Sequence, residues 1–339
     1  MESIRPELQK FYSGKKILIT GGNGYLGSNL VNQLLNFECQ IYCLDRLKLN
    51  QDLEIDKKAK LISIVCDITD SSIWQKILSG IDIIFHFAGQ TSAYVANEDP
   101  IKDFNINVLP LLFMLESCRK NKYCPTILFA GTATEVGIPR KLPVDENHHD
   151  KPVTIYDIDK LMAEGYLKYY ANAEIVKGTI LRLANVYGPG PKSSSADRGI
   201  LNMMIRKALN GEDLTLYGKG EFIRDYIFVD DVINAFLIAG MKIENMNGRH
   251  FVLGTGVGHS IREAFETIIE SVFDFTKKKV EIISTNPPQT LSPIESRNFI
   301  ANVGSLKQSI GWIPEVTLAQ GINKTVKHYD ILTQEQKLK

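Results

Sequence analysis

The sequence predicts an α/β protein that is built on a doubly wound parallel sheet and carries a smaller C-terminal lobe. Between Gly14 and about Gly190, short apolar runs alternate with longer helical patterns. Because these runs are apolar along nearly their whole length, each strand is expected to be covered on both faces, as in parallel sheets flanked by helices. The expected strands are residues 16–20, 40–44, 61–65, 81–86, 126–130 and 178–183, with one more at 251–254.

Length and composition favour two structural units. The chain has 339 residues, of which 44% are hydrophobic and 23% charged, as is usual for a globular protein. One domain of that length would be large. We expect residues 14–190 plus 226–256 to form the larger domain, and residues 191–225 plus 257–330 to form the lobe.

Charge and residue patterns exclude several classes of protein. The 39 basic residues balance the 39 acidic ones, and no basic stripe is present, so a nucleic-acid partner is not expected. No apolar run approaches the ~18–20 residues of a membrane span, and the first residues lack the apolar segment of a signal peptide. Five cysteines without a Cys-x-x-Cys pair suggest reduced thiols in a cytoplasmic protein. His148 and His149 have no further ligands at metal-binding spacing, so no metal is expected.

A glycine-rich loop follows the first expected strand. Residues 20–27 read TGGNGYLG and lead into an apolar helix at residues 26–35. The glycines can be read at 21, 24 and 27 or at 22, 24 and 27, and either spacing lets the backbone approach a pyrophosphate at a helix N-terminus. Between a strand and a helix, this pattern predicts a Rossmann-like dinucleotide site. The expected contacts are Gly21, Gly24, Tyr25, Leu26 and Gly27.

An acidic residue ends the second expected strand. Asp45 comes about 20 residues after the glycine loop, where a carboxylate binds the adenosine ribose hydroxyls. It would repel a 2′-phosphate, so we expect NAD as cofactor, although the adjacent Arg46 would weaken that preference. Asp67 and Ile68 end the third strand and are expected near the adenine. Asp67 is equally compatible with a helix-capping role.

Tyr156 and Lys160 are four residues apart in a helical pattern, so both side chains project from one face. A lysine ammonium beside a phenol lowers the phenol pKa, and the phenolate can then take a proton from a substrate hydroxyl while hydride leaves the same carbon. Thr132 follows the strand at 126–130, where its hydroxyl is able to bind the reacting oxygen. These three residues are the expected catalytic set.

Together these motifs resemble the extended short-chain dehydrogenase/reductase family, which contains the nucleotide-sugar epimerases and dehydratases. The resemblance extends from Lys16 to about Ile322. Besides the glycine loop and the catalytic set, it rests on HFAG at 86–89, NVYGP at 185–189, YGKG at 217–220, RDYIFVDD at 224–231 and GWIP at 311–314.

The resemblance implies roles at the matching positions. The catalytic triad is Thr132, Tyr156 and Lys160, the last two also touching the cofactor. Residues 86–90 line the nicotinamide, which implicates Phe87, Ala88 and Gly89, and Asn107 matches a family asparagine. Substrate contacts are implied for Thr91, Thr132, Asn185, Tyr217, Arg224 and Arg297; Tyr217 would pack on the base and the two arginines would bind the diphosphate, whose geometry suits guanidinium groups. The family also implies a homodimer through helices around 100–122 and 155–171.

The sequence departs from the family at two places. Family dehydratases carry an Asp-Glu pair directly after the catalytic threonine, whereas this chain has Ala133 and Thr134. Neither can act as an acid or a base, so dehydratase activity is not expected. Glu135 comes one residue later and is expected to point elsewhere, although it is also able to touch the substrate. Pro110 falls inside the helix that carries Asn107 and predicts a kink there.

The function expected from these residues is C4 epimerisation of a nucleoside-diphosphate hexose through a transient 4-keto sugar, with NAD reused. The same residues would also serve a 4-ketoreductase that makes a deoxysugar nucleotide and consumes reduced cofactor. Asp45 favours NAD and therefore the epimerase. A non-catalytic nucleotide-sensing scaffold is the remaining alternative; the presence of both Tyr156 and Lys160 argues against it.

Overall fold

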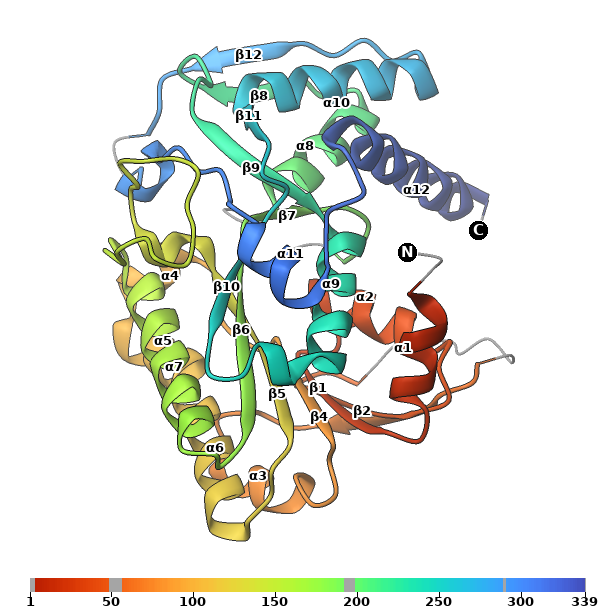
Figure 1. Ribbon diagram of the computed structural model, residues 1–339. Helices are drawn as coiled ribbons and strands as arrows, with labels where there is room; N and C mark the ends of the chain where they lie inside the picture. Colours follow the sequence, from red (N-terminus) through yellow and green to blue (C-terminus); the bar gives the residue numbers. More distant parts are fainter. Residues whose placement is uncertain (1–3, 49–56, 192–198, 289–290, 339) are drawn as a thin grey trace.

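A seven-stranded parallel sheet forms the centre of the larger domain (Figure 1). The computed structural model describes residues 4–48, 57–191, 199–288 and 291–338. In the sheet the strands stand in the order β10-β6-β5-β4-β1-β2-β3. Their bounds are β1 (Lys16–Thr20), β2 (Gln40–Asp45), β3 (Lys60–Val65), β4 (Ile83–His86), β5 (Thr126–Thr132), β6 (Lys177–Leu183) and β10 (His250–Leu253).

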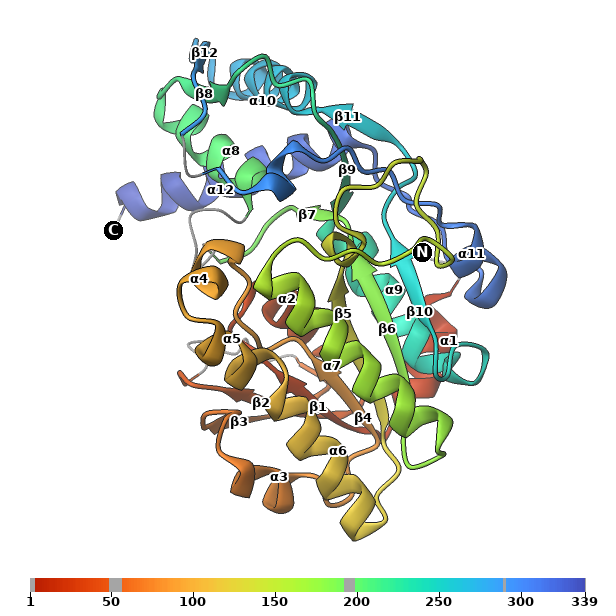
Figure 2. The ribbon, with the colours of Figure 1, turned by 90° about the vertical axis from the view of Figure 1, so that its left-hand side faces the viewer.

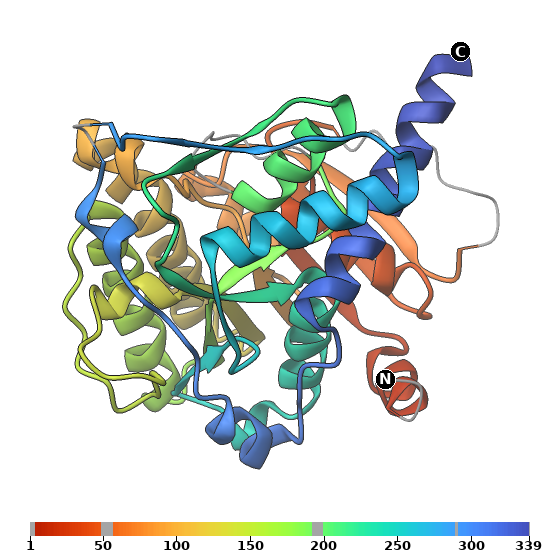
Figure 3. The ribbon, with the colours of Figure 1, turned by 90° about the horizontal axis from the view of Figure 1, so that it is seen from above.

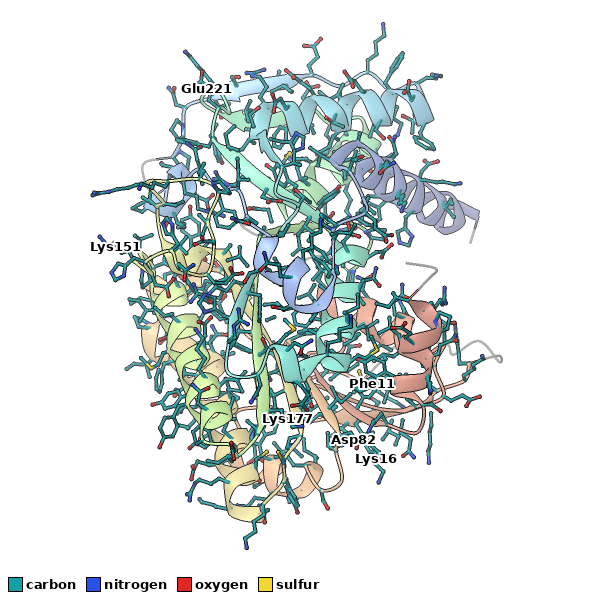
Figure 4. All side chains as sticks on the ribbon, in the orientation of Figure 1. Phe11, Lys16, Asp82, Lys151, Lys177 and Glu221 are labelled. Carbon is teal, nitrogen blue, oxygen red and sulfur yellow. The ribbon has the colours of Figure 1, made fainter. Side chains whose placement is uncertain are left out.

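The strand order reverses between β1 and β4. From β1 the chain builds outward through β2 to β3, and β4, β5 and β6 then build in the opposite direction. In a parallel sheet, ligands bind beyond the carboxyl ends of the strands at such a reversal. Lys16, Asp82 and Lys177 lie together at the opposite, amino end (Figure 4), so the carboxyl ends face the lobe.

Helices cover both faces of the sheet, as the apolar strands predict. Along β1, Ile17 and Ile19 point into one core, whereas Leu18 points into the other, and all three are fully buried. This alternation is the two-residue period of a strand with two covered faces. The first core is closed by α1 (Arg5–Tyr12), α2 (Tyr25–Leu34) and α9 (Val229–Met241), and the second by α3 (Ser71–Ile77), α6 (Leu109–Asn121) and α7 (Ile155–Asn172), which Figure 2 shows in front of the sheet.

The lobe lies over the carboxyl end of the sheet and has its own core (Figures 1 and 3). Its strands form a three-stranded and a two-stranded sheet, and its apolar residues come mainly from three helices. The elements are β7 (Asn185–Tyr187), β8 (Leu214–Tyr217), β9 (Ile223–Phe228), β11 (Gly258–Ser260), β12 (Ile282–Thr285), α8 (Ile200–Asn210), α10 (Ile261–Thr276) and α12 (Leu318–Leu338).

The remaining helical elements lie around the site or close the larger domain. They are α4 (Ala93–Glu98), α5 (Pro100–Asn107), α11 (Gly304–Ile310) and the 3-10 turns η1 (Ala133–Val136), η2 (Ile243–Asn245) and η3 (Pro293–Ser296). No helix in the ranges that the structure describes is long and apolar enough to cross a membrane.

The C-terminal segment differs from the expected division of the chain. The sequence predicts that residues 257–330 belong to the lobe, yet Leu306, Ile310 and Trp312 pack into the first core of the larger domain. The indole of Trp312 donates to the carbonyl of Asp231 on α9 at 3.2 Å. The chain therefore leaves the lobe, covers the larger domain with α11 and returns to the lobe in α12. The sequence does not predict the packing of α11 on the larger domain, because the apolar face of a helix is compatible with either core.

The predicted kink at Pro110 appears as a break between two helices. α5 ends at Asn107, and α6 begins at Leu109 with the proline in its first turn, where a missing N–H costs nothing. Val108 joins them with φ of −110°. Asn107 consequently stands at a helix end, beside the carboxyl ends of the strands.

Candidate active site

The loop between β1 and α2 has the close backbone packing that only glycine permits. Gly21 has φ of 73°, and a Cβ on Gly27 would lie 2.0 Å from the Gly21 carbonyl oxygen. A Cβ on Gly22 would lie 1.9 Å from Cys43 Sγ, so both readings of the glycine pattern describe real constraints. The first-turn N–H groups of α2, on Tyr25, Leu26 and Gly27, have no carbonyl partner within the helix and are available to an anion. The loop therefore fits a dinucleotide pyrophosphate.

Asp45 stands beside this loop at the end of β2. Its carboxylate accepts hydrogen bonds from the backbone N–H groups of Asn23 at 3.0 Å and Leu47 at 3.2 Å. It is half-buried, whereas Arg46 is exposed. Asp45 therefore lies at the carboxyl end of β2 beside the glycine loop, and its contact with an adenosine ribose stays a prediction.

Asp67 closes a turn after β3. The backbone N–H and hydroxyl of Thr69 donate to Asp67 Oδ1 at 2.9 and 2.8 Å, and together with nearby Arg46 they lower the pKa of Asp67. Ile68 is buried beneath the turn. Asp67 does not cap α3, because the N-cap of that helix is Asp70. The adenine contacts of Asp67 and Ile68 stay a prediction.

The loop after β4 is held by the hydroxyl of Thr20. That oxygen accepts the N–H groups of Phe87 at 3.2 Å and Ala88 at 3.1 Å, and it lies 2.8 Å from His86 Nδ1. Burial lowers the pKa of His86 to about 3, with the Lys160 charge adding to the effect, so the imidazole is neutral. Since Thr20 already accepts two hydrogen bonds, its proton is donated to Nδ1 and His86 carries its hydrogen on Nε2.

Asn107 fixes the next part of the same loop. Its amide accepts from the backbone N–H of Gln90 at 3.1 Å and donates to the Gln90 carbonyl at 3.1 Å and to Asp103 at 3.0 Å. A Cβ on Gly89 would lie 2.6 Å from Asn107 Oδ1. The predicted nicotinamide loop is therefore clamped from both sides by Thr20 and Asn107.

Thr132, Tyr156 and Lys160 are all buried at the carboxyl edge of the sheet. Thr132 ends β5, and α7 begins at Ile155 after Thr154, whose hydroxyl caps it by accepting the Asp157 N–H. Lys160 Nζ lies 3.9 Å from the centre of the Phe129 ring. Burial lowers the pKa of Lys160 to about 8, an effect that the carboxylates of Glu135, Asp103 and Glu164 oppose.

The two residues that replace the dehydratase pair differ from each other. Ala133 is a buried apolar residue, whereas Thr134 Oγ1 lies 2.8 Å from Thr132 Oγ1 and 2.5 Å from Asp157 Oδ1. A chain of two hydroxyls therefore connects Thr132 to a carboxylate on α7. Neither residue supplies an acid or base, as predicted.

Glu135 points away from the site into a buried ionic network. It accepts the Thr132 N–H at 2.9 Å and pairs with Arg182 at 2.9 Å. Burial, together with Glu164, raises the pKa of Glu135 well above its ordinary value. Arg182 also binds both oxygens of Asp150, at 2.6 and 2.9 Å, and contacts Glu164 at 2.7 Å. Burial opposes the ionisation of Glu164, but Arg182 lowers its pKa to about 2.

Two further carboxyl groups meet between α5 and α7. Burial, a hydrogen bond with Asp103 and the charge of that residue raise the pKa of Asp159 to about 7. Asp103 Oδ1 also accepts N–H bonds from Gln90 at 2.6 Å and Asn107 at 3.0 Å, so the proton between the two carboxyl groups is assigned to Asp159, whose pKa is the raised one. Asp159 directly precedes Lys160 in the sequence, and Asp103 contacts Gln90 of the clamped loop as well as Asn107.

The predicted substrate residues differ in exposure. Thr91 is exposed, Asn185 begins β7 half-buried, and Tyr217 ends β8 with 52% of its surface exposed. Arg224 and Arg297, in contrast, are almost fully buried beside each other.

Both arginines donate to backbone carbonyls of the segment 294–297. Arg224 binds the carbonyls of Arg297 and of Glu295, the latter at 2.7 Å, and Arg297 binds that of Ile294 at 2.8 Å. Burial lowers the pKa of Arg224, although Glu295 opposes this. Their guanidinium groups are therefore engaged in holding this segment, and their contact with a diphosphate stays a prediction.

Several residues that shape the site have no distinctive signal in the sequence. Thr20 was part of the glycine motif, but nothing local indicated that it anchors the loop after β4. No local sequence pattern marked Arg182, Asp157 or Asp159 as part of the site. An arginine in a strand, or an aspartate in the first turns of a helix, is common on the surface of any protein. Only the expectation that Arg182 lies on a strand covered on both faces would have implied carboxylate partners.

Comparison with known proteins identifies the family. Residues 17–254 match the model of the "NAD dependent epimerase/dehydratase family". The chain belongs to this family. It is thus an NAD-dependent enzyme of the extended short-chain dehydrogenase/reductase type, as its motifs predict.

Relatives across the family cover nearly the whole chain. A protein of Methanocaldococcus jannaschii named "Putative UDP-glucose 4-epimerase" is 30% identical over 91% of this chain and 97% of its own length. The UDP-glucose 4-epimerase of Mycolicibacterium smegmatis is 29% identical over 93% and 98%. The crystal structure of UDP-glucose 4-epimerase from Thermotoga maritima with UDP-glucose has a TM-score of 0.81 at 29% identity and covers 94% of this chain and 99% of that one.

The carboxyl pair between α5 and α7 makes stability depend on pH. An unfolded aspartate loses its proton near pH ~4, whereas folded Asp159 keeps it to about 7. Between these values the folded state binds more protons, so the free energy of unfolding falls as the pH rises. Asp159→Asn cannot ionise and can still donate to Asp103. From pH 5 to pH 8, the free energy of unfolding of Asp159→Asn minus that of the unaltered protein should increase by about 2 kcal/mol. This value is smaller than the full pKa shift would give, because solvent screens the two carboxyl groups.

Urea unfolding followed by tryptophan fluorescence at both pH values measures this difference. Glu221→Gln, at an exposed position in the lobe (Figure 4), is the matched control and should follow the unaltered protein. A constant stability difference between Asp159→Asn and the unaltered protein across this range would show that Asp159 holds no proton.

Proposed function

We propose that this enzyme is a nucleotide-sugar 4-epimerase that interconverts C4 epimers of a nucleoside-diphosphate hexose. The observation that carries the proposal is the burial of Thr132, Tyr156 and Lys160 together at the carboxyl edge of the sheet, beyond a glycine loop that fits NAD. The related proteins from Methanocaldococcus jannaschii and Mycolicibacterium smegmatis, which carry the name UDP-glucose 4-epimerase, support the same reaction and make UDP-glucose the first substrate to test.

The cofactor site is formed by the loops at the ends of four strands. The pyrophosphate would be held by the glycine loop, at Gly21, Gly24, Tyr25, Leu26 and Gly27. The ribose would be bound by Asp45, and the adenine would lie beside Asp67 and Ile68. Phe87, Ala88 and Gly89, positioned by Asn107, would line the nicotinamide. NAD bound there supplies an acceptor that takes hydride from the sugar and can return it.

Side chains at the end of β5 and on α7 would carry out the proton transfer. The ammonium of Lys160, buried against Phe129, favours the phenolate of Tyr156, which takes the C4 hydroxyl proton and later gives it back. Thr132 holds the reacting oxygen. The rest of the substrate would be bound by Thr91, Asn185, Tyr217, Arg224 and Arg297. These contacts would keep the nucleotide on the enzyme while the 4-keto sugar rotates.

The lobe would provide most of the nucleotide contacts. We propose that residues 185–190, 199–228, 257–303 and 313–330 form this unit, and that residues 14–184, 229–256 and 304–312 form the NAD-binding domain. Residues 49–56, 192–198 and 289–290 of the predicted division lie outside the described residues. All five cysteines are free, which suits work in a reducing compartment such as the cytoplasm.

We also propose a homodimer formed through α5 and α7. Ile101 on α5 and Ile158 and Met162 on α7 are exposed apolar residues on helices that pack together, as Figure 2 shows. An apolar surface of this kind is typical of an interface between subunits.

The proposed activity is tested with UDP-glucose as the only added reagent. The purified protein should convert it to the C4 epimer, separated by anion-exchange chromatography, with no external cofactor or reductant. Absence of the epimer, together with NADPH-dependent reduction of a 4-keto sugar nucleotide, would make the enzyme a ketoreductase instead.

The role of the phenol is tested by Tyr156→Phe. Loss of general base catalysis should reduce kcat by about 10²–10⁴ or more, while NAD content after purification stays near that of the unaltered protein. Tyr169→Phe, at an exposed position on the same helix, is the matched control and should retain activity. Activity of Tyr156→Phe near that of the unaltered protein would contradict the assignment.

The dimer is tested by Met162→Glu. Light scattering after size exclusion should give twice the 38.1 kDa chain mass for the unaltered protein and one chain mass for this variant, because a buried charge opposes association. Ile283→Glu in the lobe should remain dimeric. A monomeric unaltered protein at micromolar concentration would exclude this interface.

A further inference from the structure

One segment of the lobe contacts the surroundings of the catalytic residues at both of its ends. We call residues 292–302 the closing segment. At its start, the N–H of Ser292 donates to the hydroxyl of Tyr94 on α4 at 3.2 Å. Near its end, Phe299 belongs to the same apolar cluster as Ala133, the first residue of η1. Figure 3 shows the closing segment, in blue, starting beside α4, in orange.

The helix α4 contacts the catalytic helix as well as the closing segment. Ala96 of α4 lies in an apolar cluster with Tyr156. Asn97 Oδ1 accepts the N–H of Ile155, the first residue of α7, at 3.1 Å. Tyr94 extends from the same short helix to the lobe. Through α4, the position of the closing segment is therefore linked to the surroundings of the catalytic phenol.

The two ends of the closing segment are not held equally. Val144 donates to the carbonyl of Ile300 at 2.8 Å and accepts the N–H of Asn302 at 2.7 Å, so the later end has two backbone hydrogen bonds to the larger domain. At the other end Tyr94 supplies one hydrogen bond. The hydroxyl of Ser292 is buried there with no hydrogen-bond partner in the described part of the chain, which opposes the closed position because water would satisfy it. The end at Tyr94 is therefore the one that opens more easily.

The arginines predicted to bind a diphosphate lie at this same end. Arg224 donates to the carbonyl of Glu295 at 2.7 Å, and Arg297 donates to that of Ile294 at 2.8 Å. Because Arg224 is on β9 of the lobe, these bonds keep the segment 292–297 with the lobe when its contact with α4 breaks. A nucleotide sugar bound by the arginines would then pass between them and α4.

The catalytic side chains are nearly inaccessible while the segment is closed. Thr132 exposes 8% of its surface, and Tyr156 and Lys160 expose 7% each. A sugar has to reach the first two of these residues, so the site must open before it binds. Closure afterwards excludes water and keeps the reacting sugar in place.

We propose that Tyr94 is a positioning residue that holds the closing segment against α4, and that the nucleotide sugar enters and leaves at this end. The inference rests on the proposed function, because it takes the bound molecule to be a sugar whose 4-keto form must stay on the enzyme. Once hydride has left C4 for NAD and the hydroxyl proton has moved to Tyr156, escape of the 4-keto sugar would leave reduced cofactor behind. The contact between Tyr94 and Ser292 prevents that loss.

Tyr94→Phe tests the contact without any substrate. It keeps the ring and removes the acceptor of the Ser292 N–H, so hydrogen exchange, followed by mass spectrometry, should become severalfold faster in residues 291–297 and stay unchanged in residues 299–303. Tyr169→Phe, at an exposed position on α7, is the matched control and should exchange like the unaltered protein. Equal exchange of residues 291–297 in Tyr94→Phe and the unaltered protein would overturn the proposal.

A second measurement follows the keto sugar during turnover of UDP-glucose. In Tyr94→Phe, a severalfold larger share of turnovers should end with reduced cofactor on the enzyme, read at 340 nm. The released 4-keto nucleotide should appear in the filtrate, where reduction with borodeuteride labels it for mass spectrometry. Tyr169→Phe should match the unaltered protein in both readings. A lower kcat without more reduced cofactor would indicate a general structural effect and would overturn the proposal.

The two measurements separate this inference from the proposed function. If the unaltered protein does not epimerise UDP-glucose, the proposed function fails, and the exchange comparison still decides whether Tyr94 holds the closing segment. If the unaltered protein epimerises UDP-glucose and Tyr94→Phe behaves like Tyr169→Phe in both measurements, the proposed function stands and this inference fails.

Discussion

Arg182 is the charge on which the geometry of this site depends. It is buried on β6 and contacts carboxylates from three other segments, which are Glu135 after β5, Asp150 in the loop before α7, and Glu164 on α7. Removing it would leave buried carboxyl groups without a counter-charge, a change that typically costs 3–5 kcal/mol. Because Glu135 also binds the Thr132 N–H, the same cation ties Thr132 to the helix that carries Tyr156 and Lys160.

A second set of constraints holds the loops that would surround the nicotinamide. The neutral His86 orients Thr20, and Thr20 gathers the backbone of Phe87 and Ala88. Asn107 performs the same task for Gln90 and is available because Pro110 separates α5 from α6. The side chains that bind the backbone of these loops, Thr20 and Asn107, are uncharged, and so is His86.

Much of the fold and part of the site follow from local sequence signals. The strands, the glycine loop and the Tyr156–Lys160 spacing were predictable, because a two-residue period, a close backbone approach and a helical repeat each leave a mark in a short segment. The partners of Arg182 were not, since Glu135, Asp150 and Glu164 converge only after β5, β6 and α7 have packed.

Two other features depend on contacts between distant parts of the chain. Leu306 and Trp312 could not be assigned to a core from their own helix, and the burial of Arg224 and Arg297 arises from a segment 70 residues away from the first of them. Such relations are properties of the packed structure and have no local signature.

The central claim is that this fold holds NAD as a reusable part of an epimerase. The measurement that tests it most directly is to purify the protein without added cofactor, denature it, and identify the released nucleotide and its oxidation state by chromatography and absorbance. The account predicts NAD in nearly equimolar amount, held by the loop that Gly21 and Gly27 form and selected by Asp45. An empty protein that binds NADPH in preference to NAD would contradict it, and would make Arg46 the residue that selects the cofactor.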